Sequence, residues 1–171
     1  MEGPERRRRV GVKVEHAPAE DSPVQPVRPS GYFHPGVLAR LQAHQARGDA
    51  IVLVSGSVPA LLDVLADELG ADHVLATKMR VDSGAFTGEI DEPMIGDRKT
   101  DAVRELAADC RLDLACSSAY GDHASDVPFL ELTGIPVICG TPGTVEWAVA
   151  EDRGWSRVLL DGRAPGSPVD R

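Results

Sequence analysis

The sequence is short of aromatic residues, of cysteine and of long apolar runs, and each shortage excludes a class of protein. Aromatic residues make up 4% of the chain, so a core has to be built from aliphatic side chains, as in parallel strands covered by helices. The three cysteines include no CxxC pair, which argues against a disulfide framework or a zinc site and favours reduced thiols in the cytoplasm. No apolar stretch reaches the length of a membrane span, so we expect no membrane partner.

Positive charge is also scarce. The chain has 18 Lys and Arg residues against 27 Asp and Glu residues, which gives a formal net charge of -9. A surface with this charge repels polyanions, so we expect no nucleic-acid partner. It also repels phosphate compounds, unless a metal ion and a few local cations neutralise the binding site.

The chain divides by composition into three parts. Residues 1–30 hold an arginine run and a proline-rich stretch, which predicts mostly irregular structure. Valines at alternate positions in residues 10–14 nevertheless permit a short strand. Regular apolar patterns over residues 31–161 predict one core domain, and the Gly- and Pro-rich residues 162–171 predict a flexible tail.

Expected strands and helices alternate along the core domain. The expected strands cover residues 50–54, 72–76, 112–120 and 135–139, and the expected helices cover residues 35–48, 58–70, 100–110, 127–132 and 145–153. This alternation predicts an α/β fold with a doubly wound parallel sheet. Two further runs, 78–82 and 85–90, flank Ser83-Gly84 and predict a β-hairpin insertion.

Two polar clusters directly follow expected strands, and ligands of such sheets bind at the carboxyl ends of the strands. Ser55, Gly56 and Ser57 precede a helix, whose backbone N–H groups and dipole favour an anion. The alternative is that Ser57 is simply the N-cap of that helix. Asp122 and Asp126 suit a hard cation such as Mg²⁺, and the alternative is that Asp126 caps the next helix while Asp122 lies in a solvated turn.

Lys99 stands in front of an expected helix, between these two clusters. A lysine there offers a cation to a phosphate or to a phosphorylated carboxylate. The alternative is a surface lysine near Asp97 and Asp101. The histidines show no metal-ligand spacing, and we interpret His44 as surface or structural, while His123 lies inside the acidic cluster where it could approach a substrate.

Taken together, the clusters resemble the haloacid dehalogenase-like hydrolase superfamily, and most closely its phosphoserine-phosphatase-like branch. The matching segments are IVLVSGS with Ser55, GDRKTDAV with Lys99, and AYGDHASDVPFLELTGIPV with Asp122 and Asp126. The hairpin MRVDSGAFTGEI is also typical of that branch. The resemblance runs from about residue 33 to residue 160 and implies a Rossmann-like core.

The resemblance also implies a phosphoryl-transfer site. By resemblance, Ser55 and the backbone at Gly56 bind the phosphate, and Lys99 bridges the phosphate and the nucleophile. Asp122 binds Mg²⁺, and Asp126 supports the metal or its waters. The implied activity is Mg²⁺-dependent hydrolysis of a small phosphorylated metabolite, which would be the partner of this chain, in the cytoplasm.

The chain departs from the family pattern at its start. The first strand of the family ends in Asp-x-Asp, whose first Asp attacks phosphorus and whose second acts as acid and base, and no such motif precedes Ser55. The candidate strand at residues 10–14 is followed by Glu15, a longer carboxylate, and Ala17 cannot transfer a proton. Only the proline-rich segment stands where the family has its helical cap. The first strand and the cap are thus expected to be missing or degenerate.

Three explanations are open. The chain is a truncated form of a full phosphatase, or residues 10–16 supply a degenerate first strand, or another polypeptide donates that strand. The matching alternative in function is a catalytically inactive phosphate- and metal-binding or regulatory module on the same fold. A receiver-like or other doubly wound domain fits less well, because the order of the motifs would then be a coincidence.

Overall fold

The structure, a computed structural model, describes residues 10–13 and 33–160 of the 171-residue chain. Residues 1–9, 14–32 and 161–171 lie outside the described residues. Most of the expected irregular segment 1–30 and all of the expected tail 162–171 are therefore not described. Glu15 is therefore not described. Within the described ranges, no helix is long and apolar enough to cross a membrane.

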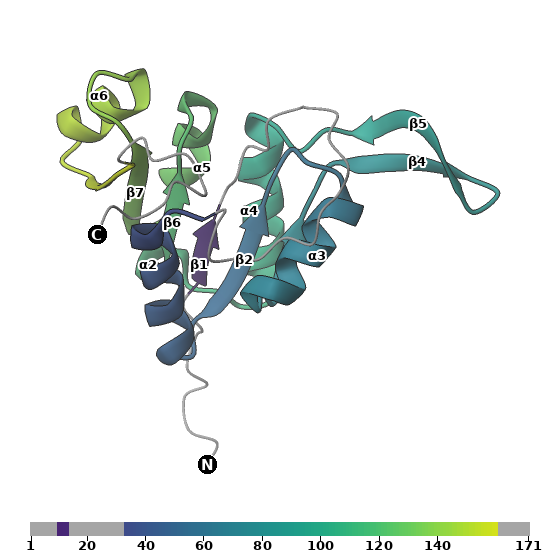
Figure 1. Ribbon diagram of the computed structural model, residues 1–171, viewed down its shortest axis with the longest axis horizontal. Coiled ribbons are helices and arrows are strands. Elements are labelled where there is room, and N and C mark those ends of the chain that lie inside the picture. Colours follow the sequence, from purple (N-terminus) through teal and green to yellow (C-terminus); the bar gives the residue numbers. More distant parts are fainter. Residues whose placement is uncertain (1–9, 14–32, 161–171) are drawn as a thin grey trace, which may run out of the picture.

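Six parallel strands form one sheet in the order β3-β2-β1-β6-β7-β8. The strands are β1 (Val10–Lys13), β2 (Ala50–Val54), β3 (His73–Leu75), β6 (Ser118–Gly121), β7 (Ile135–Gly140) and β8 (Ser156–Leu159). The strand order changes direction at β1, with β2 on one side and β6 on the other (Figure 1). Sheets of this kind bind ligands at such a switch point.

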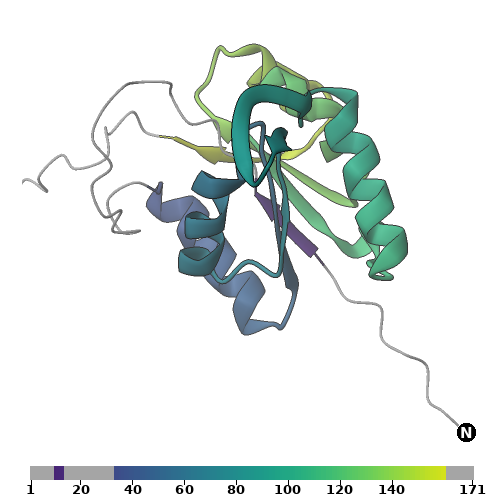
Figure 2. The ribbon, with the colours of Figure 1, turned by 90° about the vertical axis from the view of Figure 1, so that its right-hand side faces the viewer.

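Helices cover both faces of the sheet (Figure 2). The helices are α2 (Pro35–Ala46), α3 (Pro59–Leu69), α4 (Asp97–Asp109), α5 (Val127–Leu130) and α6 (Val145–Asp152), with the short 3-10 helices η1 (Leu114–Cys116) and η2 (Ala124–Asp126). Side chains of β2 alternate between the two faces, as a strand requires. Ile51 and Leu53 pack with α2 and α3, whereas Val52 and Val54 pack with α4 and α5. The continuous apolar run AIVLV is thus a strand buried on both faces, as predicted.

The short strand β1 fills the centre of the sheet. It pairs in parallel with both β2 and β6, and Lys13 lies opposite Leu53 on one side and Tyr120 on the other. Of the two alternatives for the first strand, missing or degenerate, the first does not hold: the strand is present, as the four residues Val10–Lys13. Because the chain itself fills this position, the sheet needs no strand from another polypeptide here.

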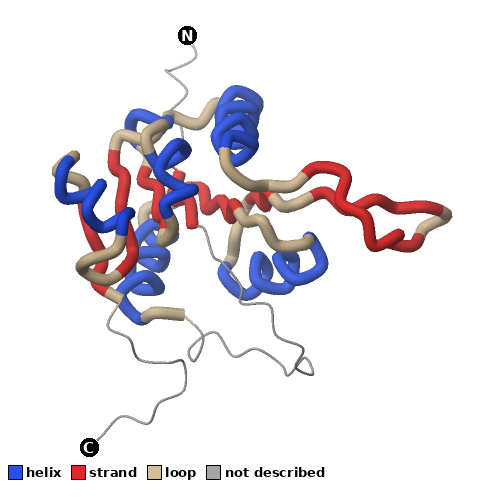
Figure 3. Tube along the Cα trace, turned by 90° about the horizontal axis from the view of Figure 1, so that it is seen from above, coloured by secondary structure: helices blue, strands red, loops and turns tan. Residues whose placement is uncertain are grey.

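The predicted hairpin is present as β4 (Lys78–Asp82) and β5 (Ala85–Glu92), and it projects away from the sheet (Figures 1 and 3). Its stem is held by charge. Glu92 forms ion pairs with Lys78, across the hairpin, and with Arg98 in the first turn of α4. These contacts connect the base of the hairpin to the helix that carries Lys99.

Two expected elements differ from the structure, and one strand was not expected. The expected strand over 112–120 is shorter, because residues Leu114–Cys116 form η1 and β6 begins at Ser118. Helix α4 begins at Asp97 rather than near residue 100, so it includes Lys99. The edge strand β8 was not predicted, because its sequence SRVL is short and mostly exposed.

A buried polar network connects the last turn of α2 to β6, close to the start of β2. His44 is 6% exposed, its Nδ1 lies 2.8 Å from Asp49 Oδ2, and its Nε2 lies 2.8 Å from Tyr120 Oη. Arg47 donates to the same Asp49 oxygen at 2.8 Å. Burial raises the pKa of Tyr120, which immediately precedes Gly121. The interpretation of His44 as surface or structural is thus resolved: this histidine is structural and buried.

The charge of Asp49 should stabilise this network in a pH-dependent way. Burial alone would raise the pKa of Asp49, but hydrogen bonds and charges of His44 and Arg47 outweigh burial and lower this pKa. The stabilisation is therefore present above the pKa of the unfolded state and is lost as pH falls through the lower folded-state pKa. We expect Asp49→Asn to lower the free energy of unfolding at pH 7 by about 1–2 kcal/mol.

Urea unfolding at pH 7 and at several pH values below 4 measures this effect. Asp49→Asn should lose less stability than the wild type on acidification, because its amide does not titrate. Asp63→Asn, on the exposed side of α3, is the control and should change neither quantity. Parallel acid profiles for the wild type and Asp49→Asn would rule out this account of the carboxylate.

Candidate functional site

The candidate site lies at the carboxyl edge of the sheet, around β1. Ser55 follows β2 and Asp122 follows β6, the two neighbours of β1. Leu53 and Tyr120 both pair with Lys13, so Ser55 and Asp122, each two residues further along, stand level on either side of β1. Strands are spaced about 4.8 Å apart, which places these two backbones about 10 Å from each other.

The loop after β2 is tightly held. Ser55 is 2% exposed, and its backbone N–H donates to Leu75 O at 2.9 Å. The N–H of Ser57 donates to Ser55 Oγ at 3.1 Å. Helix α3 begins at Pro59 with Val58 at the N-cap, where no side chain caps the helix. The alternative interpretation of Ser57 as the N-cap of this helix is therefore wrong.

Lys99 and Asp126 form a buried ion pair. Lys99 Nζ donates to Asp126 Oδ1 at 2.7 Å, and both residues are 0% exposed. The alternative of a surface lysine near Asp97 and Asp101 is wrong, and so is the placement of Lys99 in front of the helix. Desolvation of two charges is expensive, so a buried pair of this kind adds little net stability and indicates a functional position as readily as a structural one.

Asp126 has a second carboxylate oxygen directed at the end of β6. Its Oδ2 is buried and has no hydrogen-bond partner among the described residues. A Cβ atom on Gly121 would lie 2.8 Å from Asp126 Cβ and 3.1 Å from Oδ2, so the close approach requires glycine at this position. Asp126 is the N-cap residue of α5, but its side chain makes no capping hydrogen bond. The capping alternative for Asp126 is therefore wrong.

The turn between Asp122 and Asp126 is closed by His123. This exposed side chain accepts the N–H of Ser125 at 3.1 Å through Nδ1, which caps η2. The loop thereby returns both carboxylates to the end of β6, with Asp122 half-buried and Asp126 buried. A local structural role thus accounts for the position of His123, with no need for a substrate contact.

The carboxylates present allow a Mg²⁺ site but not a complete protein cage. No group of three or more His, Cys, Asp or Glu side chains that could hold a metal occurs in the described part of the chain. Mg²⁺ commonly uses one or two carboxylates and takes its other ligands from water and substrate phosphate. Asp122 and the buried Oδ2 of Asp126 fit that donor chemistry.

The structure shows where the predicted residues lie and adds one contact that the sequence did not predict. Lys99 and Asp126 are in contact, and Ser55 and Asp122 stand at strand ends on either side of β1. Glu15, the candidate nucleophile, lies outside the described residues. The missed residue is Thr77, which is 2% exposed and contacts the loop after Ser55. The segment VLATKM gives no signal for it, because a lone threonine beside a strand is common.

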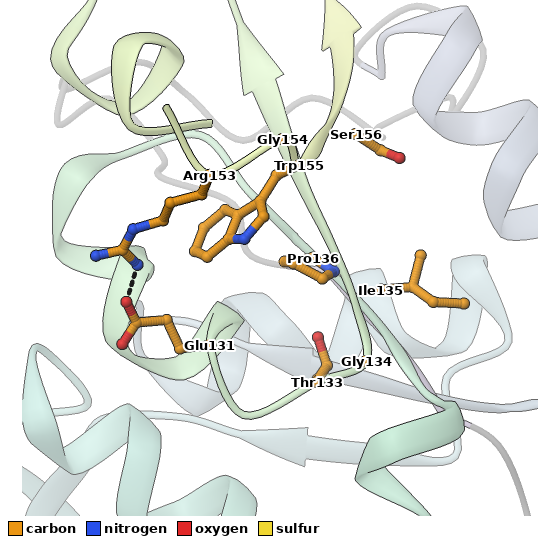
Figure 4. A pocket seen from close by; sticks show the side chains of 9 residues that line it. All are labelled: Glu131, Thr133, Gly134, Ile135, Pro136, Arg153, Gly154, Trp155 and Ser156. Carbon is orange, nitrogen blue, oxygen red and sulfur yellow. Dashed lines mark ion pairs between the residues drawn. The ribbon is translucent and has the colours of Figure 1, made fainter. Parts of the chain in front are cut away.

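A cavity of about 480 Å³ lies elsewhere, at the amino ends of β7 and β8 (Figure 4). Its lining residues are Glu131, Thr133, Gly134, Ile135, Pro136, Arg153, Gly154, Trp155 and Ser156. Arg153 there pairs with Glu131, and its guanidinium lies 5.1 Å from the centre of the Trp155 ring. Because the strands are parallel, this cavity is at the opposite edge of the sheet from Ser55 and Asp122 and plays no part in the candidate site.

Comparison with known proteins identifies relatives of this chain. The haloacid dehalogenase-like hydrolase family profile matches residues 6–131, a range that includes Ser55, Lys99, Asp122 and Asp126. The "Inhibition of morphological differentiation protein" of Streptomyces azureus is 40% identical over 136 residues, which are 75% of this chain and 49% of that protein. A phosphoserine phosphatase of Lactococcus lactis is 31% identical over 109 residues, 63% of this chain and 50% of the enzyme.

Solved structures agree on the fold. A Bordetella pertussis protein of unknown function matches with a TM-score of 0.64 and 28% identity, over 71% of this chain and 56% of that one. A substrate-bound phosphoserine phosphatase matches with a TM-score of 0.55 over 74% of this chain and 57% of that one, and at 19% identity it supports the fold alone. The chain covers only part of its curated relatives: the match spans 49% of the length of the Streptomyces azureus protein and 33% of the length of a Mycobacterium tuberculosis relative.

The ion pair makes a prediction that needs no substrate. Lys99→Met should lower the free energy of unfolding by about 3–5 kcal/mol, because it leaves the Asp126 carboxylate buried without its counter-charge. Adding Asp126→Asn to Lys99→Met should recover much of the loss, because the charge then disappears. Urea unfolding of the single and double variants at pH 7 gives the coupling energy.

The exposed ion pairs of the hairpin provide the control. Arg80 donates to Asp91 at 2.8 Å, and its side chain is 54% exposed. Arg80→Met should therefore cost less than about 1 kcal/mol. If the losses of stability in Lys99→Met and Asp126→Asn simply add in the double variant, the two charges are not coupled, and the prediction is wrong.

Proposed function

The chain belongs to the haloacid dehalogenase-like hydrolase family, and from this we propose that its carboxyl-edge site binds and hydrolyses a small phosphomonoester with Mg²⁺. The observation that carries the proposal is the fully buried Lys99–Asp126 pair beside the ends of β2 and β6. A fold alone needs no buried charges at this edge, whereas phosphoryl transfer needs fixed positive charge near the transferring group.

Phosphate recognition is assigned to the loop after β2 and to Lys99. Ser55 supplies a hydroxyl, and Gly56 lets an anion approach the backbone closely. An ammonium group carries three N–H donors, and Asp126 takes one of those on Lys99. The others can reach a phosphoryl oxygen or an attacking carboxylate. Lys99 also offsets locally the repulsion that a chain of net charge -9 exerts on an anion.

Metal binding is assigned to Asp122, with Asp126 in support. Bound Mg²⁺ supplies positive charge to the phosphoryl oxygens. Asp122, half-buried directly after β6, is placed to be the protein ligand. The buried Oδ2 of Asp126 can accept a hydrogen bond from a metal-bound water, while its Oδ1 stays with Lys99. Asp126 would thus contact both the ammonium group of Lys99 and a water molecule bound to the metal.

A second candidate function is favoured by one sequence observation. No Asp-x-Asp precedes Ser55, and Glu15 follows the strand where the family has its nucleophile. A chain without a competent nucleophile would still bind phosphate and Mg²⁺, and would act as a binding or regulatory module. The two functions share one site and differ only in turnover.

The substrate class is proposed from the relatives alone. The Lactococcus relative is named a phosphoserine phosphatase, so phosphoserine is the first natural compound to test on this chain. An aryl phosphate such as 4-nitrophenyl phosphate is the second, because its good leaving group reveals weak phosphoryl transfer.

Phosphate release from both compounds, with Mg²⁺ and with EDTA, tests the proposal. We expect Mg²⁺-dependent release that falls about 100-fold in Asp122→Asn, which removes the proposed metal ligand. Asp101→Asn, an exposed carboxylate on α4, is the matched control and should keep full activity.

Thermal shift with inorganic phosphate and Mg²⁺ separates the two candidates. Stabilisation by phosphate without any release supports the binding module. If the wild-type chain shows neither release nor a Mg²⁺-dependent shift with phosphate, both candidates are excluded.

A further inference from the structure

We propose that Thr77 is a positioning residue that sets the orientation of the phosphate-binding loop after β2. The proposal deepens the function above and rests on it. Thr77 lies between β3 and β4, away from the three motifs of the family, and is 2% exposed. Its contacts, rather than its place in a motif, carry the inference.

Thr77 makes three hydrogen bonds, and two of them go to the loop. Its Oγ1 donates to Gly56 O at 2.7 Å, and its backbone N–H donates to Ser57 O at 3.2 Å. The same Oγ1 accepts the N–H of Met94 at 3.1 Å. The carbonyl groups of the two residues that follow Ser55 are therefore both held by Thr77.

Holding these carbonyl groups also orients an N–H group. The structure contains no cis peptide bond in its described residues, and in a planar trans peptide the C=O and the N–H point in opposite directions. With the Gly56 carbonyl turned to Thr77, the N–H of Ser57 must point away from Thr77. It points to Ser55 Oγ, 3.1 Å away. Rotation of this peptide would turn a carbonyl oxygen toward Ser55 and would repel a phosphate.

The threonine also connects the loop to the hairpin. The chain enters β4 directly after Thr77 and returns from β5 at Met94, which is 2% exposed in the core. A Cβ on Gly56 would lie 3.3 Å from Ile95 Cγ2, so the loop packs closely on this returning segment. The hydroxyl of Thr77 lies where the loop, the start of the hairpin and its end meet. Its removal should loosen the loop without removing any group that contacts phosphate.

Three variants test this role. Thr77→Val keeps the shape and removes the hydroxyl, and Thr77→Ser keeps the hydroxyl. Thr133→Val is the control: Thr133 is also buried, at 7% exposed, and its Oγ1 donates to Leu130 O at 3.0 Å, but it lines the cavity at the opposite edge. Each valine variant loses a buried threonine hydroxyl, and only one of them touches the loop.

Titration of the full chain with inorganic phosphate in Mg²⁺ is the first measurement. Thr77→Val should raise the dissociation constant about tenfold, whereas Thr77→Ser and Thr133→Val should stay within about twofold of the wild type. Where the wild type turns over, KM should rise more than kcat falls. An unchanged constant in Thr77→Val, or an equal rise in Thr133→Val, overturns the proposal.

Amide hydrogen exchange is the second measurement and does not depend on phosphate. The amides of Ser57 and Met94 should exchange at least about tenfold faster in Thr77→Val than in Thr77→Ser. A wild-type chain that binds no phosphate would refute the proposed function, while faster exchange would still show that Thr77 holds the loop. Unchanged exchange of both amides in Thr77→Val would refute the role of Thr77.

Discussion

A buried ammonium and a buried carboxylate must lie in contact, and this constraint organises the carboxyl edge of the sheet. Lys99 enters from the first turn of α4 and Asp126 from η2, two segments that are separated by β6 in the chain. Their contact fixes the position of both segments relative to β6, since neither charge can move into the core alone. It leaves Asp122 half-buried directly after the end of β6. The loop after β2 forms the other side of the same edge.

The two sides of the edge are held by different means. The side near β6 depends on charge. The close approach of Gly121 to Asp126 lets the carboxylate lie directly against the end of β6. The side near β2 depends on neutral hydrogen bonds from Thr77 to two carbonyl groups. In the proposed reaction the charged groups can change their contact partners, whereas the peptide groups have to stay in place. The division suits a site in which one side contributes electrostatics and the other contributes shape.

The sequence predicted the elements whose pattern is strong and missed those set by distant contacts. The run AIVLV and the hairpin around Ser83 have strong local signals, and both are present. The burial of Lys99 could not be predicted, because GDRKTD reads as a solvated segment; only the helix that begins at Asp97 turns Lys99 inward. Thr77 was missed for a similar reason, since its partners lie about 20 residues away on both sides. Strand β8 gave no signal because most of it is exposed.

The central place of the short strand β1 also affects how the chain acquires its structure. Gly11 pairs with Ile51 on one side but with Ser118 on the other, so the middle of the sheet joins residues about 100 positions apart. Such contacts close large loops and make folding slow. During synthesis, β1 leaves the ribosome long before β6 exists, and one edge of it stays unsatisfied until then. The half-made chain, rather than the finished one, is therefore the form most in need of a chaperone.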